Sequence, residues 1–408
     1  MRAQEIADKL AAFKGRGVGT DAERRAARWL VGELGRGGRQ VVIEPFWCRP
    51  NWPLTHAWHI ALALAGSLVA VSSPRVGGAL LLAALVFVLS DVFLGFSPGR
   101  WLTRARASQN VVALPAPDRQ PSEPNLRLII TANYDAGRTG LVFRDFLRQP
   151  VASIRNDLRG NTLGWLGWLA IAMVWLLVVA IVRVQGHNST GIGFAQLPPT
   201  IGLVLGLALL LDLATSERSP AAGDNGTGIA VALELARALD AAPPRHVEVE
   251  VVLTGAGDCE GLGLRQYLRA RKRSINPQRT AVLGIAACTA GAPRWWSSEG
   301  TLRPLRSAVR MKQLAARLAE EEPDLHAARH TDRSCTPAYP ALAARIPALA
   351  IGARGQYGLA PRSHQTGDVA ATVESSAVEQ VVEFGLMLVD AIDASLVERQ
   401  PSGTPTPA

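Results

Sequence analysis

The fold is decided by residues 221–262, which read AAGDNGTGIAVALELARALDAAPPRHVEVEVVLTGAGDCEGL. A glycine-rich turn leads into residues 226–240, whose apolar positions follow the spacing of a buried helix. Residues 247–254 first alternate valine with glutamate and then become apolar, as expected of a strand that enters a core. Polar residues follow at 258–260, at the strand's carboxyl end, where α/β sheets place their sites.

The flanking sequence continues this alternation of helices and strands. Asp21 is predicted to cap the first of the remaining helices. We predict these helices over 21–34, 262–271, 302–320 and 373–396, and further strands over 40–45, 126–132, 281–288 and 346–351. The pattern indicates an α/β fold, with a mostly parallel mixed sheet and helices on both faces.

Four long apolar runs interrupt the α/β pattern. They cover residues 57–72, 78–96, 163–182 and 201–214, in a chain that is 48% hydrophobic and only 19% charged. About 20 apolar residues are needed to cross a bilayer, so the last run spans only if residues from about Gln196 join it. An interfacial or buried helix is the alternative there. The runs predict two transmembrane hairpins.

The two hairpins divide one α/β domain into pieces. Soluble pieces are expected at 1–52, 98–160 and 216–398, and the hairpins at 53–97 and 161–215. Residues 399–408, rich in Pro, Ser and Thr, are expected to be disordered.

The net charge of +9 is compatible with two kinds of partner, nucleic acid or a lipid surface. The sequence has no aromatic-interleaved basic stripe and no zinc-finger spacing, so we expect no nucleic-acid partner and take the bilayer as the partner. Arginines concentrate at the soluble ends of the hairpins, namely Arg49, Arg100, Arg104, Arg106, Arg144, Arg148, Arg155, Arg159 and Arg218. By the positive-inside rule, a multi-pass plasma-membrane protein with a cytoplasmic soluble domain is expected. Four cysteines without paired spacing agree with that compartment.

Polar residues at strand ends are the candidates for chemistry. They are Asn133, Asp135, Asp224, Asp258, Cys259, Glu260 and, in the late loop 361–368, His364. Carboxylates, a thiol and an imidazole around one crevice would suit a metal ion. Each residue alone is more often a cap, a turn residue or a solvated side chain.

The order of these residues resembles the co-catalytic zinc exopeptidases, metallopeptidase family twenty-eight, which contains bacterial leucyl aminopeptidases. The matching blocks are Ile130-Thr-Ala-Asn133-Tyr134-Asp135, Ala221-Ala-Gly-Asp224-Asn225-Gly-Thr227-Gly228, Thr254-Gly-Ala-Gly-Asp258-Cys259-Glu260-Gly261-Leu262, Ala281-Val-Leu-Gly-Ile-Ala286-Ala287 and Ser363-His364-Gln-Thr-Gly-Asp368. The resemblance extends over nearly all of the soluble sequence, with the hairpins as insertions. The resemblance therefore implies a zinc exopeptidase fold.

The resemblance also implies which ligands are missing. In the family one Asp bridges two zinc ions, and each ion takes one more His and one more carboxylate. The bridging position is Asp224, and the late histidine is His364. Asn133 replaces the first histidine and Ala286 replaces a carboxylate, so one of the two sites is expected to be lost. Asp135 matches the residue that would orient that missing histidine.

The other zinc site is expected to be altered. Cys259 stands where the family has a glutamate ligand, and a thiolate binds zinc at about 2.3 Å. Asp224, Cys259 and His364 could thus hold at most one zinc ion, or none. Asp258 stands at the general base and is one methylene shorter than glutamate.

Three functions remain open from the sequence. The first is a degenerate, membrane-anchored peptidase that binds peptides or protein partners without cleaving them. The second is an active single-zinc hydrolase of the aminopeptidase type. The third is a membrane scaffold module of a larger complex, for which Asp212 in the fourth apolar run is the ionisable residue that hints at a function.

Overall fold

One mixed sheet organises the soluble part of the chain. The computed structural model describes residues 3–121, 125–158 and 162–397. Within them the strand order is β1-β2-β4-β3-β5-β9-β6-β7, with β8 beside β6. The strands are β1 (Gln40–Cys48), β2 (Arg106–Leu114), β3 (Leu126–Asn133), β4 (Val247–Thr254), β5 (Thr280–Ile285), β6 (Ala292–Glu299), β7 (Leu305–Arg306), β8 (Ala328–Thr331) and β9 (Ala348–Arg354). The predicted α/β class with a mixed sheet is confirmed.

The centre of the sheet is parallel and its flanks are largely antiparallel. Strands β4, β3, β5 and β9 run parallel to one another, and β8 runs parallel to β6. The pairs β1–β2, β2–β4, β6–β9 and β6–β7 are antiparallel. Asn133 at the end of β3 is in register with Thr254 at the end of β4. The polar segments that follow these two strands therefore start side by side at one edge of the sheet.

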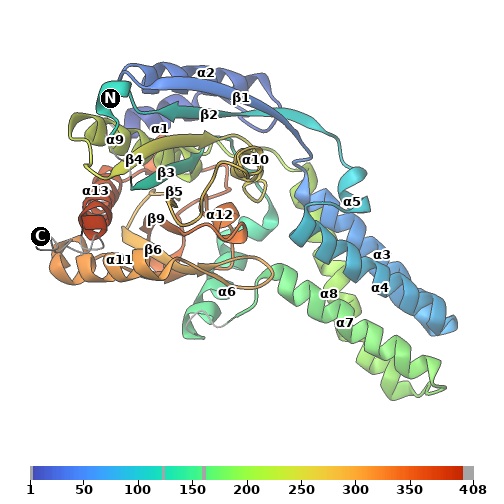
Figure 1. The fold of residues 1–408 in the computed structure, drawn as a ribbon. Coiled ribbons are helices and arrows are strands. Elements are labelled where there is room, and N and C mark those ends of the chain that lie inside the picture. The colour runs from blue at the N-terminus through green and yellow to red at the C-terminus, as the bar shows by residue number, and fades with distance from the viewer. Residues whose placement is uncertain (1–2, 122–124, 159–161, 398–408) are drawn as a thin grey trace, which may run out of the picture.

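Helices cover both faces of the sheet (Figure 1). The helices are α1 (Ala3–Ala11), α2 (Asp21–Gly35), α3 (Trp52–Ser72), α4 (Pro74–Leu94), α5 (Pro98–Trp101), α6 (Asp145–Asp157), α7 (Trp165–Val184), α8 (Thr190–Thr215), α9 (Gly228–Ala241), α10 (Leu262–Ala270), α11 (Val309–Glu321), α12 (Tyr339–Ala343) and α13 (Ser375–Val397). Helices α1, α2, α9, α11 and α13 pack into one core, and α10 and α12 into a core on the other face. Leu128 and Ile130 of β3 face the first core, and Ile129 faces the second. This alternation explains why the strand reads as uniformly apolar.

Most predicted element ends are shifted by a few residues, and two predictions need correction. The predicted helix over 302–320 begins only at Val309, because residues 305–306 form the short strand β7. The cap of α2 is Thr20, whose side chain accepts a hydrogen bond from the backbone N–H of Glu23. Asp21 is instead the first helical residue, where its negative charge favours the helix N-terminus.

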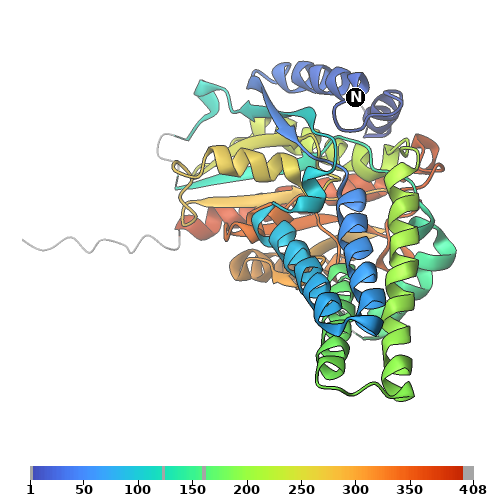
Figure 2. The same ribbon diagram turned by 90° about the vertical axis from the view of Figure 1, so that its right-hand side faces the viewer.

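Helices α3, α4, α7 and α8 are each long and apolar enough to cross a membrane. They form two hairpins that project together from one side of the domain (Figures 1 and 2). Their buried residues make one shared core, so the hairpins form a four-helix bundle. The fourth apolar segment, short in the sequence, is part of a 26-residue helix.

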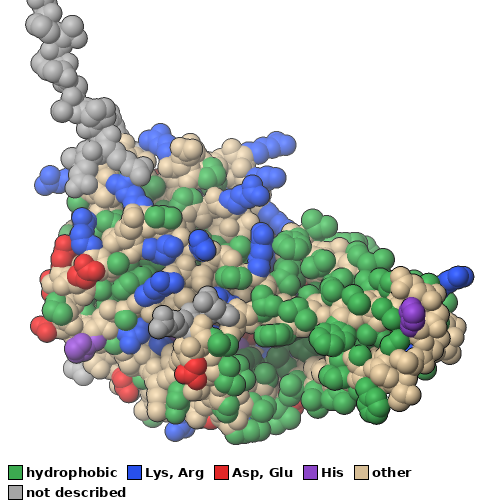
Figure 3. All heavy atoms as spheres, turned by 90° about the horizontal axis from the view of Figure 1, so that it is seen from below, with side chains coloured by type: hydrophobic (Ala, Val, Ile, Leu, Met, Phe, Trp, Pro, Cys, Tyr) green, Lys and Arg blue, Asp and Glu red, His purple; other side chains and the backbone are tan. Residues whose placement is uncertain are grey.

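Close backbone contact holds the first hairpin together. A side-chain carbon added at Gly77 of α4 would lie 2.4 Å from the backbone nitrogen of Ala70 in α3. Small residues at such crossings are typical of helices that pack inside a bilayer. The outer surface of the bundle is largely hydrophobic and carries few charges in Figure 3.

Candidate metal site

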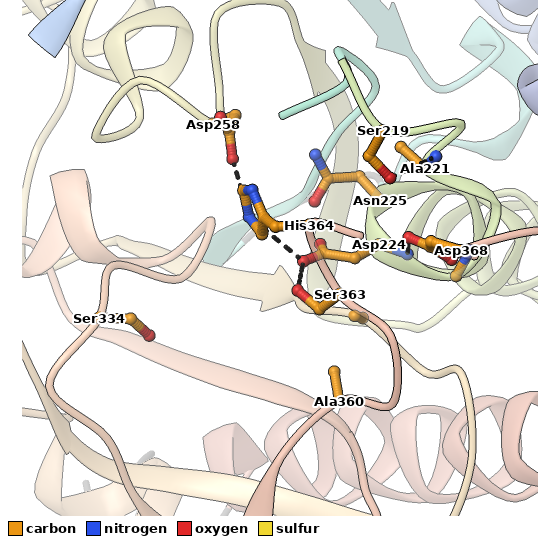
Figure 4. Close-up of polar contacts among 12 residues, drawn as sticks. Ser219, Ala221, Asp224, Asn225, Asp258, Ser334, Ala360, Ser363, His364 and Asp368 are labelled. Atoms are coloured by element: carbon orange, nitrogen blue, oxygen red, sulfur yellow. Dashed lines mark hydrogen bonds and ion pairs between the residues drawn. The ribbon is translucent and has the colours of Figure 1, made fainter. Parts of the chain in front are cut away.

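Asp224, Asp258 and His364 converge at one point beyond the sheet (Figure 4). The Nε2 atom of His364 lies 3.2 Å from Oδ1 of Asp258 and 3.6 Å from Oδ2 of Asp224. Their side chains are each less than one-fifth exposed. Three segments that are far apart in the sequence thus bring two carboxylates to one imidazole nitrogen.

The environment of His364 determines which of its nitrogens faces the carboxylates. Its Nδ1 lies 3.0 Å from the backbone carbonyl of Arg138, which can only accept a hydrogen bond, so Nδ1 carries the hydrogen. The ring also stacks on Phe143, with 4.2 Å between ring centroids. Nε2 is left facing two carboxylate oxygens. It must carry a proton or lie beside a cation, because a bare lone pair would be repelled by both.

The charges of the three groups depend on one another. Burial lowers the pKa of His364, but the neighbouring carboxylates of Asp258 and Asp224 outweigh burial and leave that pKa raised. Burial and the nearby Asp224 raise the pKa of the Asp258 carboxyl, although His364 and Arg218 act in the opposite direction. The site therefore favours a positive charge between the two carboxylates.

Asp224 is held by the turn that precedes α9. Residues Ala222–Thr227 form this turn, labelled η3, and Asp368 fastens it by accepting hydrogen bonds from the backbone N–H groups of Gly223 (2.6 Å) and Asp224 (3.1 Å). Gly223 has no room for a side chain, since an added carbon would lie 2.6 Å from Asp368. Ser363 donates a hydrogen bond to Oδ2 of Asp224. Neither Asp368 nor Ser363 was given a role by the sequence, although Asp368 closes the last matching block.

Asp135 organises the loop that carries Asp258. Its carboxylate accepts hydrogen bonds from the backbone N–H groups of Gly257 (2.8 Å) and Asp258 (3.3 Å). Burial, followed by the charge of Asp258, raises the pKa of Asp135 to about 7. The charge of Arg218 acts in the opposite direction and lowers this pKa. Through its two hydrogen bonds, Asp135 positions the loop that carries Asp258.

The positions that the family would use for a second ion offer no further donors toward the site. The amide oxygen of Asn133 accepts a hydrogen bond from Thr254 at 2.8 Å. Gly257 packs against the same amide. Ala286 is buried in the core between the sheet and α10 and α12.

Cys259 follows Asp258 but lies among apolar side chains. It packs with Val18, Phe46 and Ala256, and burial raises the pKa of its thiol well above the usual range. In the described residues, only one set of three or more His, Cys, Asp or Glu side chains brings all its ligand atoms within 4.8 Å of one another, and neither Cys259 nor the trio Asp224, Asp258 and His364 belongs to it. The assignment of Cys259 as a ligand stays a prediction.

That set consists of His56, Asp91 and Glu260, and a guanidinium already occupies it. Arg100 donates to both oxygens of Asp91, at 2.7 and 2.6 Å, and lies 3.5 Å from Glu260. Because the guanidinium bonds both oxygens of Asp91 and also lies beside Glu260, we interpret the cluster as an ion-pair network. It ties the first hairpin to the loop that carries Asp258.

A small pocket of about 20 Å³ opens beside the site and is large enough for a water molecule. Residues from both hairpins help to line it. The lining residues are Pro50, Trp52, Pro53, Arg138, Phe143, Leu213, Arg218, Asp258, Cys259 and His364. The site therefore lies directly beside the soluble ends of α3 and α8.

Comparison with known structures assigns this arrangement to the zinc exopeptidase fold. A zinc aminopeptidase from Bacillus subtilis matches with a TM-score of 0.54 and 13% identity, over 95% of this chain and 93% of the other. Tannerella forsythia glutaminyl cyclase matches with a TM-score of 0.53 and 15% identity, over 95% and 97%. LapB from Legionella pneumophila matches with a TM-score of 0.52 and 10% identity, over 96% and 71%.

A family model matches part of the sequence. Residues 211–389 match the sequence model of peptidase family M28. A comparison with curated protein sequences found no match. The resemblance to the M28 zinc exopeptidases that the motif blocks indicate is therefore confirmed.

Proposed function

We propose that this chain is a membrane-anchored M28-type domain that holds one zinc ion and binds the amino-terminal end of a peptide, with little or no cleavage. The observation that carries the proposal is the position of His364 Nε2, which faces Asp224 and Asp258 at 3.6 and 3.2 Å. The binding of peptide amino termini is taken over from the zinc aminopeptidases that the fold resembles.

The donor atoms fit a single zinc ion. Carboxylate oxygens and an imidazole nitrogen are ordinary zinc ligands, and three protein ligands leave a position open. The hydrogen bond from Nδ1 of His364 to the Arg138 carbonyl is the kind that orients a zinc-binding histidine. When bound, zinc would act as a Lewis acid that polarises a carbonyl oxygen. Asn133 and Ala286 give no basis for a second ion.

The pocket favours binding over cleavage. Among its lining residues Asp258 is the only carboxylate and His364 the only imidazole. If both serve as ligands, the pocket holds no further group that could accept a proton from water at the distance that general base catalysis requires.

A single-zinc hydrolase is the second candidate. It is favoured by one observation, that Cys259 lines the pocket together with Asp258 and His364. With Cys259 as the third ligand, Asp258 would be free to act as the base.

Membrane anchoring by the four apolar helices is part of the proposal. Their length and composition support it, as does their common direction away from the domain. The arginines at the soluble ends of the hairpins support a cytoplasmic domain.

Peptide binding tests the proposal. We would measure the affinity of the zinc-loaded, detergent-solubilised chain for a fluorescent peptide with a free amino terminus and for its acetylated form. The variants Asp224→Asn and His364→Ala should lose the difference between the two peptides. The matched control Asp118→Asn changes an exposed aspartate that lies outside the site, and it should behave like the wild type.

The result expected is tighter binding of the free amine by at least about tenfold, which corresponds to 1.4 kcal/mol, without release of free amino acid. Release of amino acid that is absent in His364→Ala would support the hydrolase instead. Equal affinity for both peptides in every variant would contradict both and leave the scaffold hypothesis.

A further inference from the structure

Helix α6 carries an apolar stripe that the soluble domain does not cover. Leu147, Val151, Ile154 and Leu158 follow one another at helical spacing, and Phe146 lies beside them. Val151 is 65% exposed and Ile154 58% exposed. A contiguous exposed apolar stripe of this kind is typical of a contact surface, so it points to a covering partner.

The opposite face of α6 is fastened to the domain. Ala152 is buried there, Arg148 donates to the carbonyl of Ala360 at 3.1 Å, and Arg155 pairs with Asp332 at 2.8 Å. Asn156 donates to the carbonyl of Tyr357 at 3.0 Å. Because its polar face is held, α6 has a fixed orientation, and the apolar stripe points away from the sheet.

The bundle indicates what covers the stripe. Helix α6 lies near the level at which α7 leaves the domain (Figure 1), and α7 begins at Trp165, a few residues along the chain. The exposed Arg144 stands at the start of α6, where anionic lipid headgroups would meet it. An amphipathic helix with these features lies in the plane of a membrane surface, with its apolar face buried by about 5–10 Å.

We propose that α6 is an in-plane membrane helix, whose apolar stripe lies in the headgroup region of an anionic phospholipid bilayer. The inference rests on the membrane anchoring proposed above. It has a consequence for the site, because α6 holds the loop of His364. Gln365 donates to the carbonyl of Phe143 at 2.8 Å and to Asp145 at 2.9 Å, and Phe143 stacks on His364. The candidate metal site then lies at the bilayer surface, where a membrane-attached peptide would meet it.

Spin-label accessibility tests this placement in the full chain. The protein would be reconstituted into vesicles of phosphatidylcholine and phosphatidylglycerol, with a nitroxide on Val151→Cys or, as a second position, Ile154→Cys. Two matched valines serve as references, Val178→Cys in α7 and Val309→Cys in α11, which are 53% and 66% exposed. The unsubstituted chain gives the background from the native cysteines.

Access to oxygen relative to a water-soluble nickel chelate distinguishes lipid from water. A ratio at residue 151 that is several-fold above that at 309 and approaches that at 178 is the expected result. A ratio at 151 equal to that at 309, with a high ratio at 178, would overturn the in-plane helix and leave the anchoring intact. A low ratio at 178 as well would overturn both. Low access to both reagents at 151 would mean that a second protein covers the stripe, which also overturns the proposal.

Discussion

Substituting Gly137 by alanine should abolish zinc binding without altering any ligand. A methyl carbon at residue 137 would lie 2.3 Å from Cε1 of His364, 2.6 Å from its Nδ1 and 2.7 Å from Oδ1 of Asp258. Ordinary contacts begin at 3.4 Å. Phe143 and the Arg138 carbonyl confine the ring, so the imidazole has to leave its place.

The size of the effect follows from the displacement. The ring must move by roughly 1 Å, several times the ~0.2 Å tolerance of a metal–ligand distance. Changes to groups that only orient a ligand cost about 10–100-fold in metal affinity. Moving the ligand itself should therefore weaken zinc binding by at least about 100-fold, or ~2.7 kcal/mol.

Competition with a fluorescent zinc chelator measures this loss. Gly32→Ala is the matched control, because nothing lies within 4 Å of the added carbon in α2. It should keep zinc and, as a helix substitution, raise the free energy of unfolding by up to about 1 kcal/mol. His364→Ala, which removes the ring without a clash, should match Gly137→Ala. Wild-type zinc affinity in folded Gly137→Ala would refute the proposed coordination by His364.

Three further substitutions test the structure away from the zinc. Burial raises the pKa of Glu299 from 4.5 to about 7. Between these pH values the folded state keeps a proton on Glu299 that the unfolded state has lost. The contribution to the free energy of unfolding, roughly 3 kcal/mol, is therefore fully present below pH 4.5 and is lost as the pH rises through 7. Glu299→Gln should flatten the fall in unfolding free energy between those pH values, as denaturant titration would measure; an unchanged slope would contradict the shift. Arg100→Ala leaves the buried Asp91 without its guanidinium partner and should lower the unfolding free energy by about 3–5 kcal/mol, whereas the exposed Arg104→Ala should change it by less than about 0.5 kcal/mol. Equal melting temperatures of the two variants would argue against the network. Gly77→Val forces α3 and α4 apart and should cost about 1–3 kcal/mol in detergent, whereas Gly78→Val, whose nearest contact is at 3.6 Å, should be tolerated; similar losses in both would contradict the close crossing.

The sequence predicted elements best where their hydrophobic pattern is local. Strand β4 is found at the predicted residues 247–254. Its alternating valine and glutamate residues, followed by an apolar end, indicate which side of the strand is buried. Strand β2 was not predicted, because its first half is polar and it follows directly on the first hairpin. Strands β6 and β8 were missed as well: β6 contains Pro293 and Arg294, and β8 has only four residues.

The candidate site was predicted in part. Asp224, Asp258 and His364 could be proposed from their order in the chain and their position after strands, and they lie together. The directions in which neighbouring side chains point were harder to predict. Residues 258–260 form a turn that points Asp258 toward His364 and places Cys259 among apolar side chains that include Phe46. No pattern of spacing signals this.

Contacts between distant segments could not be predicted from the sequence. The pairing of Arg100 with Asp91 and Glu260 joins a hairpin to a loop more than 150 residues away, and nothing local to any of the three indicates it. The stacking of Phe143 on His364 likewise depends on how α6 docks on the domain.

Zinc content tests the central claim most directly. Elemental analysis of the detergent-purified chain would compare the wild type with Asp258→Ala, Cys259→Ala and His364→Ala. We predict about one zinc ion per chain in the wild type and in Cys259→Ala, and none above background in the other two. Loss of zinc in Cys259→Ala with retention in Asp258→Ala would contradict the proposed ligands and favour the single-zinc hydrolase. The absence of zinc from folded, zinc-treated wild type would contradict the one-metal site altogether.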